Sequence, residues 1–496
     1  MNANGLLNKH WFHVSSHLIL DAILFNAAFI LGIFLRFGDE GAEATRRFLP
    51  FLLFGSLVFS LTAYIWGLYS THSLNKGFSK RALILSACSL IAIGMVISIA
   101  YLNTARPPGR GVMLLGGGLT FLFSLVHHFF LLLALRSTRE RVLYVVTCKF
   151  DEAETQLFST FGGDQLNLVG LVESMAYEAT GTIPALGKTS DLQAIVRNHK
   201  INRVLYTNRS LRDRELCKQF CQLRFLGITV MPLVSLCEEI DQYVPIELVN
   251  SEWLLYASGE PHLLYIKKIK RSFDVISSLL GLVLSMPLML LAMIAVKLTS
   301  RGPVFYRQKR TGRLGKDFEI FKLRTMRVDA EKNGAVWSVG ENDPRVTFCG
   351  RFLRRYRIDE IPQLLNVLLG QMSFVGPRPE RPEMNMQLAK EIPYYQERFM
   401  VQPGITGWAQ VNYPYGASTQ DARRKLEYDL YYMKHMSIFL DIFILLDTVR
   451  IILCGGATEK HRHHPSRHKA IQDWELARSE NESDRFRTGN IQVSSI

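Results

Sequence analysis

Two neighbouring carboxylates, Asp359 and Glu360, lie in a strongly basic part of the sequence, since five arginines occupy residues 345–357. The segment IPQLLNVLLG follows them, with a proline in its first turn and a glycine at its end, which predicts a short helix. The acids are therefore expected at a helix N-terminus, where backbone N–H groups and the arginines favour ionised carboxylates. Such a pair could simply cap the helix, or it could carry chemistry.

The chemistry that two adjacent carboxylates can perform next to phosphate groups is phosphoryl transfer. An ionised aspartate can attack phosphorus to give a covalent intermediate, and a neighbouring carboxylate can hold Mg²⁺ against the phosphate oxygens. In that interpretation Asp359 is the nucleophile and Glu360 is the metal ligand. Adjacent residues can divide these roles because their side chains leave the backbone in different directions.

Three further segments supply groups of the phosphate-binding type. RQKRTGRLGK at 307–316 and KLRTMR at 322–327 are basic, and SFVGPRPERP at 373–382 contains a stiff Gly-Pro-Arg-Pro turn. Arginine matches phosphate oxygens with a planar fork, so several arginines around a carboxylate suit a pyrophosphate substrate. The candidate substrate-binding residues are Gln308, Arg310, Lys322, Arg324, Arg354 and Arg378.

The overall charge also indicates an anionic partner, since the chain of 496 residues carries a formal charge of +14. Nucleic acid fits poorly, because the basic residues lack regularly interleaved aromatics and no known binding motif is present. Phosphorylated substrates and an anionic membrane surface both agree with the charge. The length predicts about two to four domains. The seven cysteines form no CxxC pair, which predicts reduced thiols in a cytosolic compartment.

Residues 1–138 are expected to form a four-helix transmembrane bundle. Four apolar runs approach the ~20 residues that a spanning helix needs, at 14–36, 50–69, 83–102 and 112–135. Basic residues in the second connection and after the fourth run place both ends of the bundle in the cytoplasm. Asp21, inside the first run, is either a bundle-facing structural residue or a functional carboxylate.

Residues 139–255 change to short β-rich runs that alternate with helical stretches, which predicts βαβ units on a Rossmann-like parallel sheet. The predicted strands are RVLYVV, NLVGLVE, INRVLYT and GITVMPLV. A dinucleotide site would need glycines directly after the first strand, but that turn reads TCKFDE. Glu173 ends the second strand, where a ribose-binding acid could lie. Without the glycine turn, a docking or regulatory module is favoured over a nucleotide site.

Residues 256–456 contain the acids and begin with an unusual apolar run at 272–298. Basic clusters bracket this run, and a straight spanning helix would export one of them, against the positive-inside rule. Pro287 interrupts the run, and an interior proline removes a backbone hydrogen bond and kinks a helix. A re-entrant helix that breaks between Ser285 and Pro287 and returns to the same side explains both facts. An ordinary kinked span is the alternative.

Two C-terminal segments carry weaker signals. The apolar stretch at 437–453 includes Asp441, Asp447 and Arg450, whose charges disfavour a lipid span and predict an interfacial or core helix. The polar tail at 457–496 contains KHRHHPSRH and is predicted to be disordered, with histidines that could bind a metal adventitiously.

Four motifs in the C-terminal part carry a family resemblance. GPVFYRQKRTGRLGKDFEIFKLRTM, RFLRRYRIDEIPQLLNVLLGQMSFVGPRP, QPGITGWAQV and EYDLYY follow one another in this order. Over about 265–455 they resemble the bacterial sugar transferases, also called monotopic phosphoglycosyltransferases. The predicted bundle and Rossmann-like region resemble the large members of this family, which begin exopolysaccharide, capsule or O-antigen repeat units.

The resemblance implies transfer of a hexose 1-phosphate from a UDP-sugar to undecaprenyl phosphate, with release of UMP, at the cytoplasmic face of a bacterial inner membrane. It implies that Asp359 forms a phosphosugar-enzyme intermediate, that Glu360 supports Mg²⁺, and that Arg354 and Arg378 lie near the nucleotide-sugar. It further implies a mostly helical catalytic domain with a re-entrant helix, contact with the lipid bilayer and a possible homodimer. Small members place serine directly before the proline, whereas Met286 intervenes here, which leaves the role of Ser285 open.

Two other functions stay open at this point. A non-enzymatic scaffold or regulator of a polysaccharide assembly complex would use the middle domain to sense a ligand. A polytopic transferase with an all-membrane site would act in a single step, although only one proline-broken apolar segment adjoins the acids. The residues do not reveal the sugar, the polysaccharide pathway, the ligand of the middle domain, the oligomeric state or the role of the tail.

Overall fold

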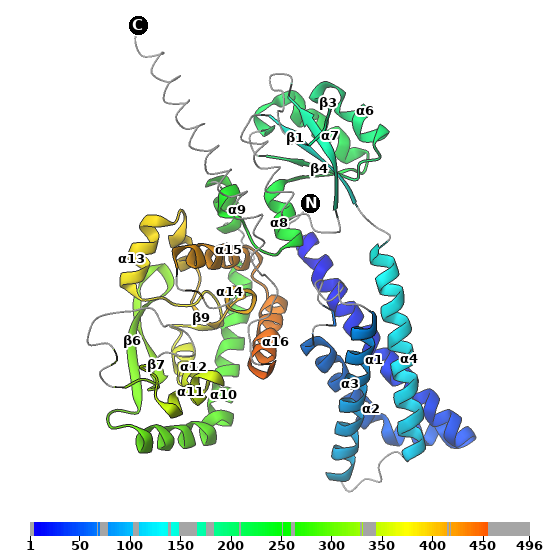
Figure 1. Cartoon of the computed structure of the whole chain (residues 1–496), viewed down its shortest axis with the longest axis vertical. Helices are drawn as coiled ribbons and strands as arrows, with labels where there is room; N and C mark the ends of the chain where they lie inside the picture. The colour runs from blue at the N-terminus through cyan, green and yellow to red at the C-terminus, as the bar shows by residue number, and fades with distance from the viewer. Residues whose placement is uncertain are drawn as a thin grey trace. The chain divides into compact units, whose positions relative to one another are not determined.

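The computed structural model describes the chain over 4–66, 68–69, 78–102, 109–136, 140–147, 166–174, 183–207, 210–249, 251–258, 263–327, 330, 344–413, 416 and 418–454. The chain divides into two compact units, Met1–Arg139 and Glu140–Ile496, and each is described by itself. Figure 1 labels their helices and strands. The tail at 457–496 and most of the TCKFDE turn lie outside the described residues.

The described part of the first unit consists of four long helices, which confirms the prediction from the apolar runs (Figure 1). Their bounds are α1 (Asn4–Phe37), the 3₁₀ turn η1 (Gly38–Glu40), α2 (Gly41–Ile65), α3 (Phe78–Leu102) and α4 (Arg110–Arg136). Much of the interior is apolar, and it fully buries Phe25, Phe29 and Phe59. Helix α2 begins before the predicted residue 50, because its first turns are polar and a search for apolar runs misses them.

Membrane association is indicated by four helical stretches of the described chain that are long and apolar enough to cross a bilayer. They are Val14–Ile65, which includes both α1 and α2, Arg81–Ile99, Arg110–Leu131 and Lys268–Thr299. The first three belong to the bundle and the fourth to the second unit. Lys76, Arg106 and Arg139, which bear on the predicted orientation, lie outside the described residues.

The second unit begins with a five-stranded parallel sheet in the order β3-β2-β1-β4-β5, which confirms the predicted parallel sheet. The elements here are β1 (Glu140–Val146), β2 (Leu166–Glu173), β3 (Ala185–Lys188), η4 (Thr189–Asp191), α6 (Leu192–Asn198), β4 (Arg203–Tyr206), η5 (Ser210–Arg212), α7 (Arg214–Phe225), β5 (Thr229–Pro232), α8 (Leu233–Ile240) and η6 (Ile246–Leu248). Strand β3 was not predicted, because its four residues form no recognisable run. Glu173 at the end of β2 lies 3.4 Å from the Lys188 ammonium.

The rest of the second unit is mostly helical and contains the two acids. Its elements are α9 (Ser251–Ser258), α10 (Leu263–Thr299), β6 (Phe305–Thr311), η7 (Arg313–Gly315), β7 (Asp317–Leu323), α11 (Phe348–Arg355), η8 (Ile358–Glu360), α12 (Gln363–Leu368), β8 (Ser373–Val375), α13 (Pro382–Glu391), η9 (Tyr395–Met400), β9 (Gly404–Thr406), α14 (Trp408–Asn412), α15 (Thr419–His435) and α16 (Ile438–Cys454). Strands β6 and β7 form an antiparallel hairpin, and β8 pairs with β9 in parallel.

Helix α10 changes direction along its length, so that its second limb turns away from the line of the first (Figure 1). Pro287 lies inside the helix. The Ser285 hydroxyl donates a 2.6 Å hydrogen bond to the carbonyl of Gly281. A proline together with a side chain that binds the preceding turn is a recognised cause of helix bending. The expected break region of 285–287 therefore has the local chemistry of a bend.

Both limbs of α10 contact neighbouring elements of the second unit, α12 and α11. In the first limb, Arg271 donates to the carbonyl oxygens of Val367 and Leu368, at 2.5 and 2.8 Å. In the second limb, Val296 packs in one cluster with Leu353. The two ends of this apolar helix are thus held by neighbouring elements of one folded body.

One side of the apolar helix α16 faces the core of the second unit. The ammonium of Lys270 donates to Asp441 Oδ2 at 2.5 Å, and the Tyr432 hydroxyl donates to Asp441 Oδ1 at 2.8 Å. Ile444 is fully buried, whereas Phe439 is exposed. The charged residues that argued against a lipid span are therefore accommodated inside the second unit.

Candidate active site

A sharp reversal of the chain positions the two acids. Helix α11 ends at Arg355, and Arg357 adopts a left-handed conformation with φ of +57° before η8 begins. Asp359 and Glu360 lie in η8, one turn before α12. The N-cap of α12 is Pro362, and no side chain caps that helix end. The acids are therefore held in a tight turn and do not cap the helix.

Glu360 is the centre of a buried cluster of charges. Its Oε1 accepts hydrogen bonds from Lys322 and Arg378, at 3.0 and 3.1 Å, and its Oε2 lies 3.5 Å from Arg357. Burial alone would raise the pKa of this carboxyl, but the charges of Lys322, Arg378 and Arg357 hold the pKa well below its ordinary value. Glu360 is therefore a permanent anion at physiological pH.

Asp359 has the opposite electrostatic environment. Its side chain is only 6% exposed, and its Oδ1 is buried without a hydrogen-bond partner in the described structure. Burial and the negative charge of Glu360 raise the pKa of Asp359. The charges of Lys322, Arg354 and Arg357 limit that rise. The charge of Asp359 is therefore less completely compensated than that of Glu360.

The structure brings together three of the predicted phosphate-binding residues around these acids. Lys322 and Arg378 both donate to Glu360. Arg354 acts on Asp359 through its charge, and its Nε donates to the Thr325 hydroxyl at 2.8 Å. These three cations come from β7, α11 and the Gly-Pro-Arg-Pro turn, so distant segments of the sequence supply one site.

The other predicted phosphate-binding residues contact other groups. Arg324 donates to the carbonyl and hydroxyl oxygens of Ser300, just after α10, at 2.9 and 2.8 Å. Gln308 accepts from Arg310 at 2.7 Å, and Arg310 also donates to the carbonyl of Pro379 at 3.1 Å. Arg324 thus holds the end of α10, while Gln308 and Arg310 support the turn that carries Arg378.

Family assignment follows from comparison with known proteins. The family model described as bacterial sugar transferase matches residues 265–455. The exopolysaccharide production protein PSS of Rhizobium leguminosarum bv. phaseoli is 41% identical over 193 residues, which are 38% of this chain and 96% of that protein. The UDP-glucose:undecaprenyl-phosphate glucose-1-phosphate transferase of Caulobacter vibrioides is 42% identical over 186 residues, 37% of this chain and 69% of that protein. The chain belongs to the bacterial sugar transferase family.

Longer relatives of this chain match over a smaller share of their length. The UDP-N-acetylgalactosamine-undecaprenyl-phosphate N-acetylgalactosaminephosphotransferase of Aeromonas hydrophila is 45% identical over 187 residues, 38% of this chain and 44% of that protein. The chain thus spans less than half of the length of this relative. The four-helix bundle and the parallel sheet both precede the segment that the family model matches.

Several residues that support the candidate site were not predicted from the sequence. Gln410 accepts from Arg378 at 3.0 Å, and Arg398 donates to the backbone carbonyl of Arg378 at the same distance. Asp429 in turn lies 3.0 Å from Arg398, and its burial raises its pKa to about 6. Gln410 belongs to QPGITGWAQV and Asp429 to EYDLYY, so the available signal was membership of a family motif.

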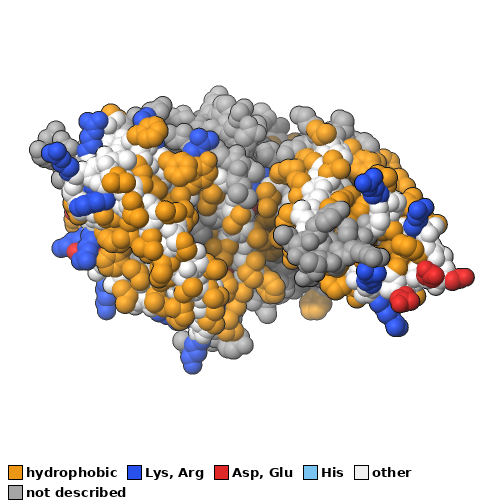
Figure 2. Space-filling view, turned by 90° about the horizontal axis from the view of Figure 1, so that it is seen from below, with side chains coloured by type: hydrophobic (Ala, Val, Ile, Leu, Met, Phe, Trp, Pro, Cys, Tyr) orange, Lys and Arg blue, Asp and Glu red, His pale blue; other side chains and the backbone are white. Residues whose placement is uncertain are grey.

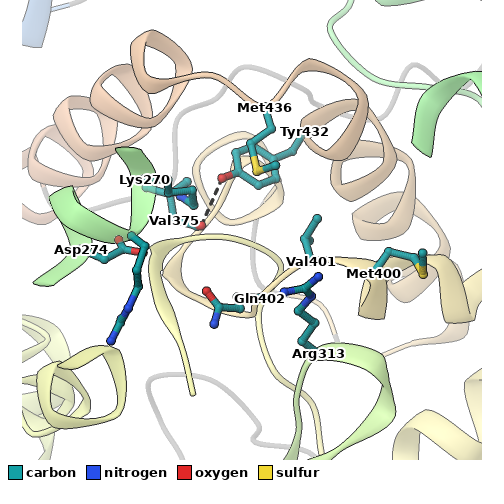
Figure 3. Close-up of a pocket in the computed structure, with 10 residues that line it drawn as sticks. Lys270, Asp274, Arg313, Val375, Met400, Val401, Gln402, Tyr432 and Met436 are labelled. Atoms are coloured by element: carbon teal, nitrogen blue, oxygen red, sulfur yellow. Dashed lines mark hydrogen bonds between the residues drawn. The ribbon is translucent and has the colours of Figure 1, made fainter. Parts of the chain in front are cut away.

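A cavity of about 190 Å³ lies between the start of α10 and the segment at 400–402 (Figure 3). Lys270 and Tyr432, on its wall, are both bound to Asp441. The backbone N–H of Phe374 donates to Asp274 Oδ1, while Asp274 Oδ2 is buried without a partner among the described residues. Neither Asp359 nor Glu360 lines this space. The cavity is therefore separate from the two acids, and no pattern in the sequence predicted it.

An exposed apolar surface adjoins the elements that carry the two acids. Space-filling side chains show extensive hydrophobic cover with Lys and Arg at its edges (Figure 2). The exposed apolar side chains on α10, α11 and α12 include Leu279, Leu284, Leu291, Phe348, Phe352 and Leu365. A patch of this kind marks a site of membrane or protein interaction. Because α11 leads directly into η8, the apolar surface and the acids are adjacent in the chain.

Proposed function

We propose that this sugar transferase moves a hexose 1-phosphate from a UDP-sugar to undecaprenyl phosphate and releases UMP. This reaction would initiate an exopolysaccharide, capsule or O-antigen repeat unit. The names of relatives over the same segment support the reaction class. The observation that carries the proposal is the buried, unpartnered oxygen of Asp359 beside a glutamate that three cations surround.

In the first step, a carboxylate oxygen of Asp359 attacks the phosphorus that carries the sugar. An oxygen–phosphorus bond forms, the bond from that phosphorus to the bridging oxygen breaks, and UMP leaves with the electron pair. The raised pKa of Asp359 makes its ionised oxygen a stronger nucleophile. Since Oδ1 is buried, entry of the substrate must displace a surrounding side chain. Arg357, at 43% the most exposed of the three cations on Glu360, is our candidate.

In the second step, a phosphate oxygen of undecaprenyl phosphate attacks the same phosphorus and the Asp359 carboxylate leaves. The lipid then carries a pyrophosphate-linked sugar, and the aspartate is regenerated without net proton transfer. The soluble nucleotide departs before the lipid acceptor reaches the same carboxylate. Ping-pong kinetics are therefore expected.

The cations around the acids are proposed to bind the diphosphate. Lys322 and Arg378 both donate to Oε1 of Glu360. A substrate phosphate bound beside Glu360 could therefore accept hydrogen bonds from the same two side chains. Arg354 would stabilise charge near Asp359. Charge-assisted hydrogen bonds from such side chains suit the oxygens of a diphosphate.

Mg²⁺ is proposed as a cofactor, with Glu360 as its ligand. The donor set fits, because among the described residues Glu360 Oε2 makes only the long contact to Arg357 and Asp359 Oδ1 has no partner. Carboxylate oxygens are the ligands that Mg²⁺ prefers, commonly together with substrate phosphates. The surrounding cations disfavour a bare divalent ion, which suggests that metal and diphosphate bind together. When bound, the metal would neutralise negative charge on the phosphate oxygens.

The catalytic part is proposed to lie on the cytoplasmic face of a bacterial inner membrane with α10 re-entrant. Arg271 and Val296, in opposite limbs, both contact the same folded body. Basic residues flank the apolar run at both ends, which disfavours export of either end. The exposed apolar surface of α10 and α11 would face lipid. The homodimer implied by the family resemblance stays a prediction.

The test is a half-reaction with the purified full chain in nanodiscs that lack undecaprenyl phosphate. We expect one sugar of a UDP-sugar panel to give a protein whose intact mass increases by a sugar phosphate, with release of UMP. Adding undecaprenyl phosphate should discharge the adduct. Glu319→Gln, on the exposed side of β7, serves as a control that keeps the adduct. UMP release only in the presence of the lipid acceptor, without any adduct, would refute the two-step mechanism.

A further inference from the structure

A buried polar cluster lies inside the four-helix bundle, in a unit that the family model does not match. Asp21 of α1 is fully buried, and His128 of α4 is 1% exposed. His127 Nδ1 lies 2.9 Å from Asp21 Oδ1, and His128 Nε2 lies 3.1 Å from Asp21 Oδ2. Polar side chains inside membrane helices are costly, and they usually mark a function.

Two more side chains complete this cluster. The Tyr69 hydroxyl donates to Asp21 Oδ2 at 2.6 Å, and His17 Nδ1 lies 3.0 Å from His127 Nε2. Further along α4, the hydroxyl oxygens of Ser124 and Thr120 are buried without partners in the described structure. The inner side of α4 is thus polar beyond the residues that touch Asp21.

Donor geometry favours a metal ion at this cluster. One ligand atom each from Asp21, His127 and His128 lies within 4.8 Å of the other two. In a tetrahedral zinc site with bonds of about 2.0–2.1 Å, ligand atoms are about 3.3 Å apart. His127 Nδ1 and His128 Nε2 lie 2.9 and 3.1 Å from different oxygens of the Asp21 carboxylate, so each nitrogen is already near a ligand oxygen at about this spacing. Small adjustments of the rings would therefore suffice for coordination.

A hydrogen-bond network of neutral imidazoles leaves one feature of the cluster unexplained. The ion-pair partners of Asp21 among the described residues are the two histidines, so neutral rings leave its charge uncompensated. A divalent cation bound by neutral imidazoles would supply the missing charge.

We propose that Asp21, His127 and His128 form a binding site for a transition-metal cation of the zinc class. Imidazole and carboxylate donors suit such a cation better than Mg²⁺ or Ca²⁺. Tyr69 or a water molecule would complete the coordination, and His17 would orient His127 through its second ring nitrogen. The metal would join α1 to α4 inside the bundle. This inference does not depend on the proposed sugar transfer.

The test measures zinc content in the full chain, in a background whose tail histidines His461, His463, His464 and His468 are replaced by asparagine. After incubation with Zn²⁺ and desalting, we expect about one zinc per chain. His128→Gln should lower this value by about tenfold or more, as loss of a metal ligand requires. The matched control His199→Asn, outside the bundle, should retain the zinc. Equal zinc content in the parent and His128→Gln would overturn the proposal.

Two further measurements distinguish loss of the metal site from failure of a variant to fold. Zinc should raise the midpoint of thermal unfolding of the parent and leave that of His128→Gln unchanged. Co²⁺ added to the metal-free parent should give the visible absorption of a tetrahedral site with nitrogen and oxygen ligands. A folded parent that takes up neither Zn²⁺ nor Co²⁺ would refute the site and leave a hydrogen-bond network.

Discussion

Two buried acidic clusters, one in each unit of the chain, differ in the side chains that surround the carboxylate. Around Asp21 the partners are two imidazoles and a phenol. Around Glu360 they are an ammonium and two guanidinium groups. Guanidinium and ammonium groups bind oxyanions, whereas imidazole nitrogens bind transition metals. The partner type therefore indicates the ligand class better than the acid itself does.

The clusters also differ in how completely each carboxylate is satisfied. Asp21 has a hydrogen-bond partner at both oxygens. Asp359 has an oxygen that is buried and unpartnered, and it adjoins a second negative charge. The fold thus places an incompletely compensated anion next to its apolar surface. A buried group of this kind costs stability, and a catalytic role would explain its presence.

The largest expected effect is that of Asp359→Asn on turnover. The amide cannot attack phosphorus, so the rate should fall by roughly 10⁴-fold or more, as for other catalytic nucleophiles. Thermal stability should stay equal or rise, because the amide removes repulsion from Glu360. Steady-state UMP release and the unfolding midpoint are the measurements. A variant that kept its turnover would remove the proposed distinction between the two clusters.

Glu360→Gln, unlike Asp359→Asn, should lower the stability of the fold as well as the turnover. Removing one partner of a buried ion pair costs about 3–5 kcal/mol, and here three cations lose their shared anion. Thermal unfolding should therefore occur at a lower temperature than in Asp359→Asn, with the loss of turnover as a second readout. If Glu360→Gln proved the more stable of the two variants, the assignment of the compensated and uncompensated acids would be wrong.

As the pH is lowered, turnover should fall before the protein unfolds. Asp359 has a raised pKa, so it becomes protonated first as the pH falls, and turnover should drop by about tenfold per pH unit below that pKa. Glu360 has a pKa well below 4.5, so its stabilisation is complete above pH 4.5 and is lost only as the pH falls through the lower value.

A pH titration of turnover beside circular dichroism checks this expectation. Inactivation should be reversible on return to neutral pH while the helical signal persists. Loss of activity that coincided with unfolding would contradict the opposed pKa values of the pair.

The smallest expected effect concerns the apolar surface beside the acids. Phe352→Trp on α11 should change turnover by about twofold or less, because exposed substitutions rarely exceed ±0.5 kcal/mol. Brominated lipids should quench the fluorescence of this tryptophan if α11 contacts the bilayer. Phe225→Trp on α7 is the matched control, since Phe225 is also exposed but lies in the sheet region, and it should show no added quenching. Equal quenching at both positions would argue against a lipid-facing α11.

Periodic patterns in the sequence predicted the elements well, because they depend on local composition. The four helices and the strands β1, β2, β4 and β5 were found from runs of apolar residues. Arg354, Asp359 and Glu360 could be proposed together because they lie within seven consecutive residues of the sequence. The short strand β3 gave no comparable signal.

Contacts between distant residues could not be predicted from local patterns. His127 lies 106 residues from Asp21 in the sequence, and only helix packing brings them together. Arg324 looked equivalent to Lys322, yet Lys322 lies in β7 and donates to Glu360, whereas Arg324 follows the end of β7 and donates to Ser300. The residue at which the strand ends, and therefore which of two similar cations reaches the acids, appears only in the fold.

The attachment of α10 has a consequence for the choice of bilayer. Arg271 fastens the first limb to α12, and Arg324 fastens Ser300 just beyond the second. In the proposed re-entrant placement, α10 enters and leaves the membrane on the same side. Its length therefore need not match the thickness of the bilayer. Catalysis should therefore tolerate bilayers of different hydrocarbon thickness, while the packing of headgroups in a single leaflet determines how easily a lipid phosphate reaches Asp359.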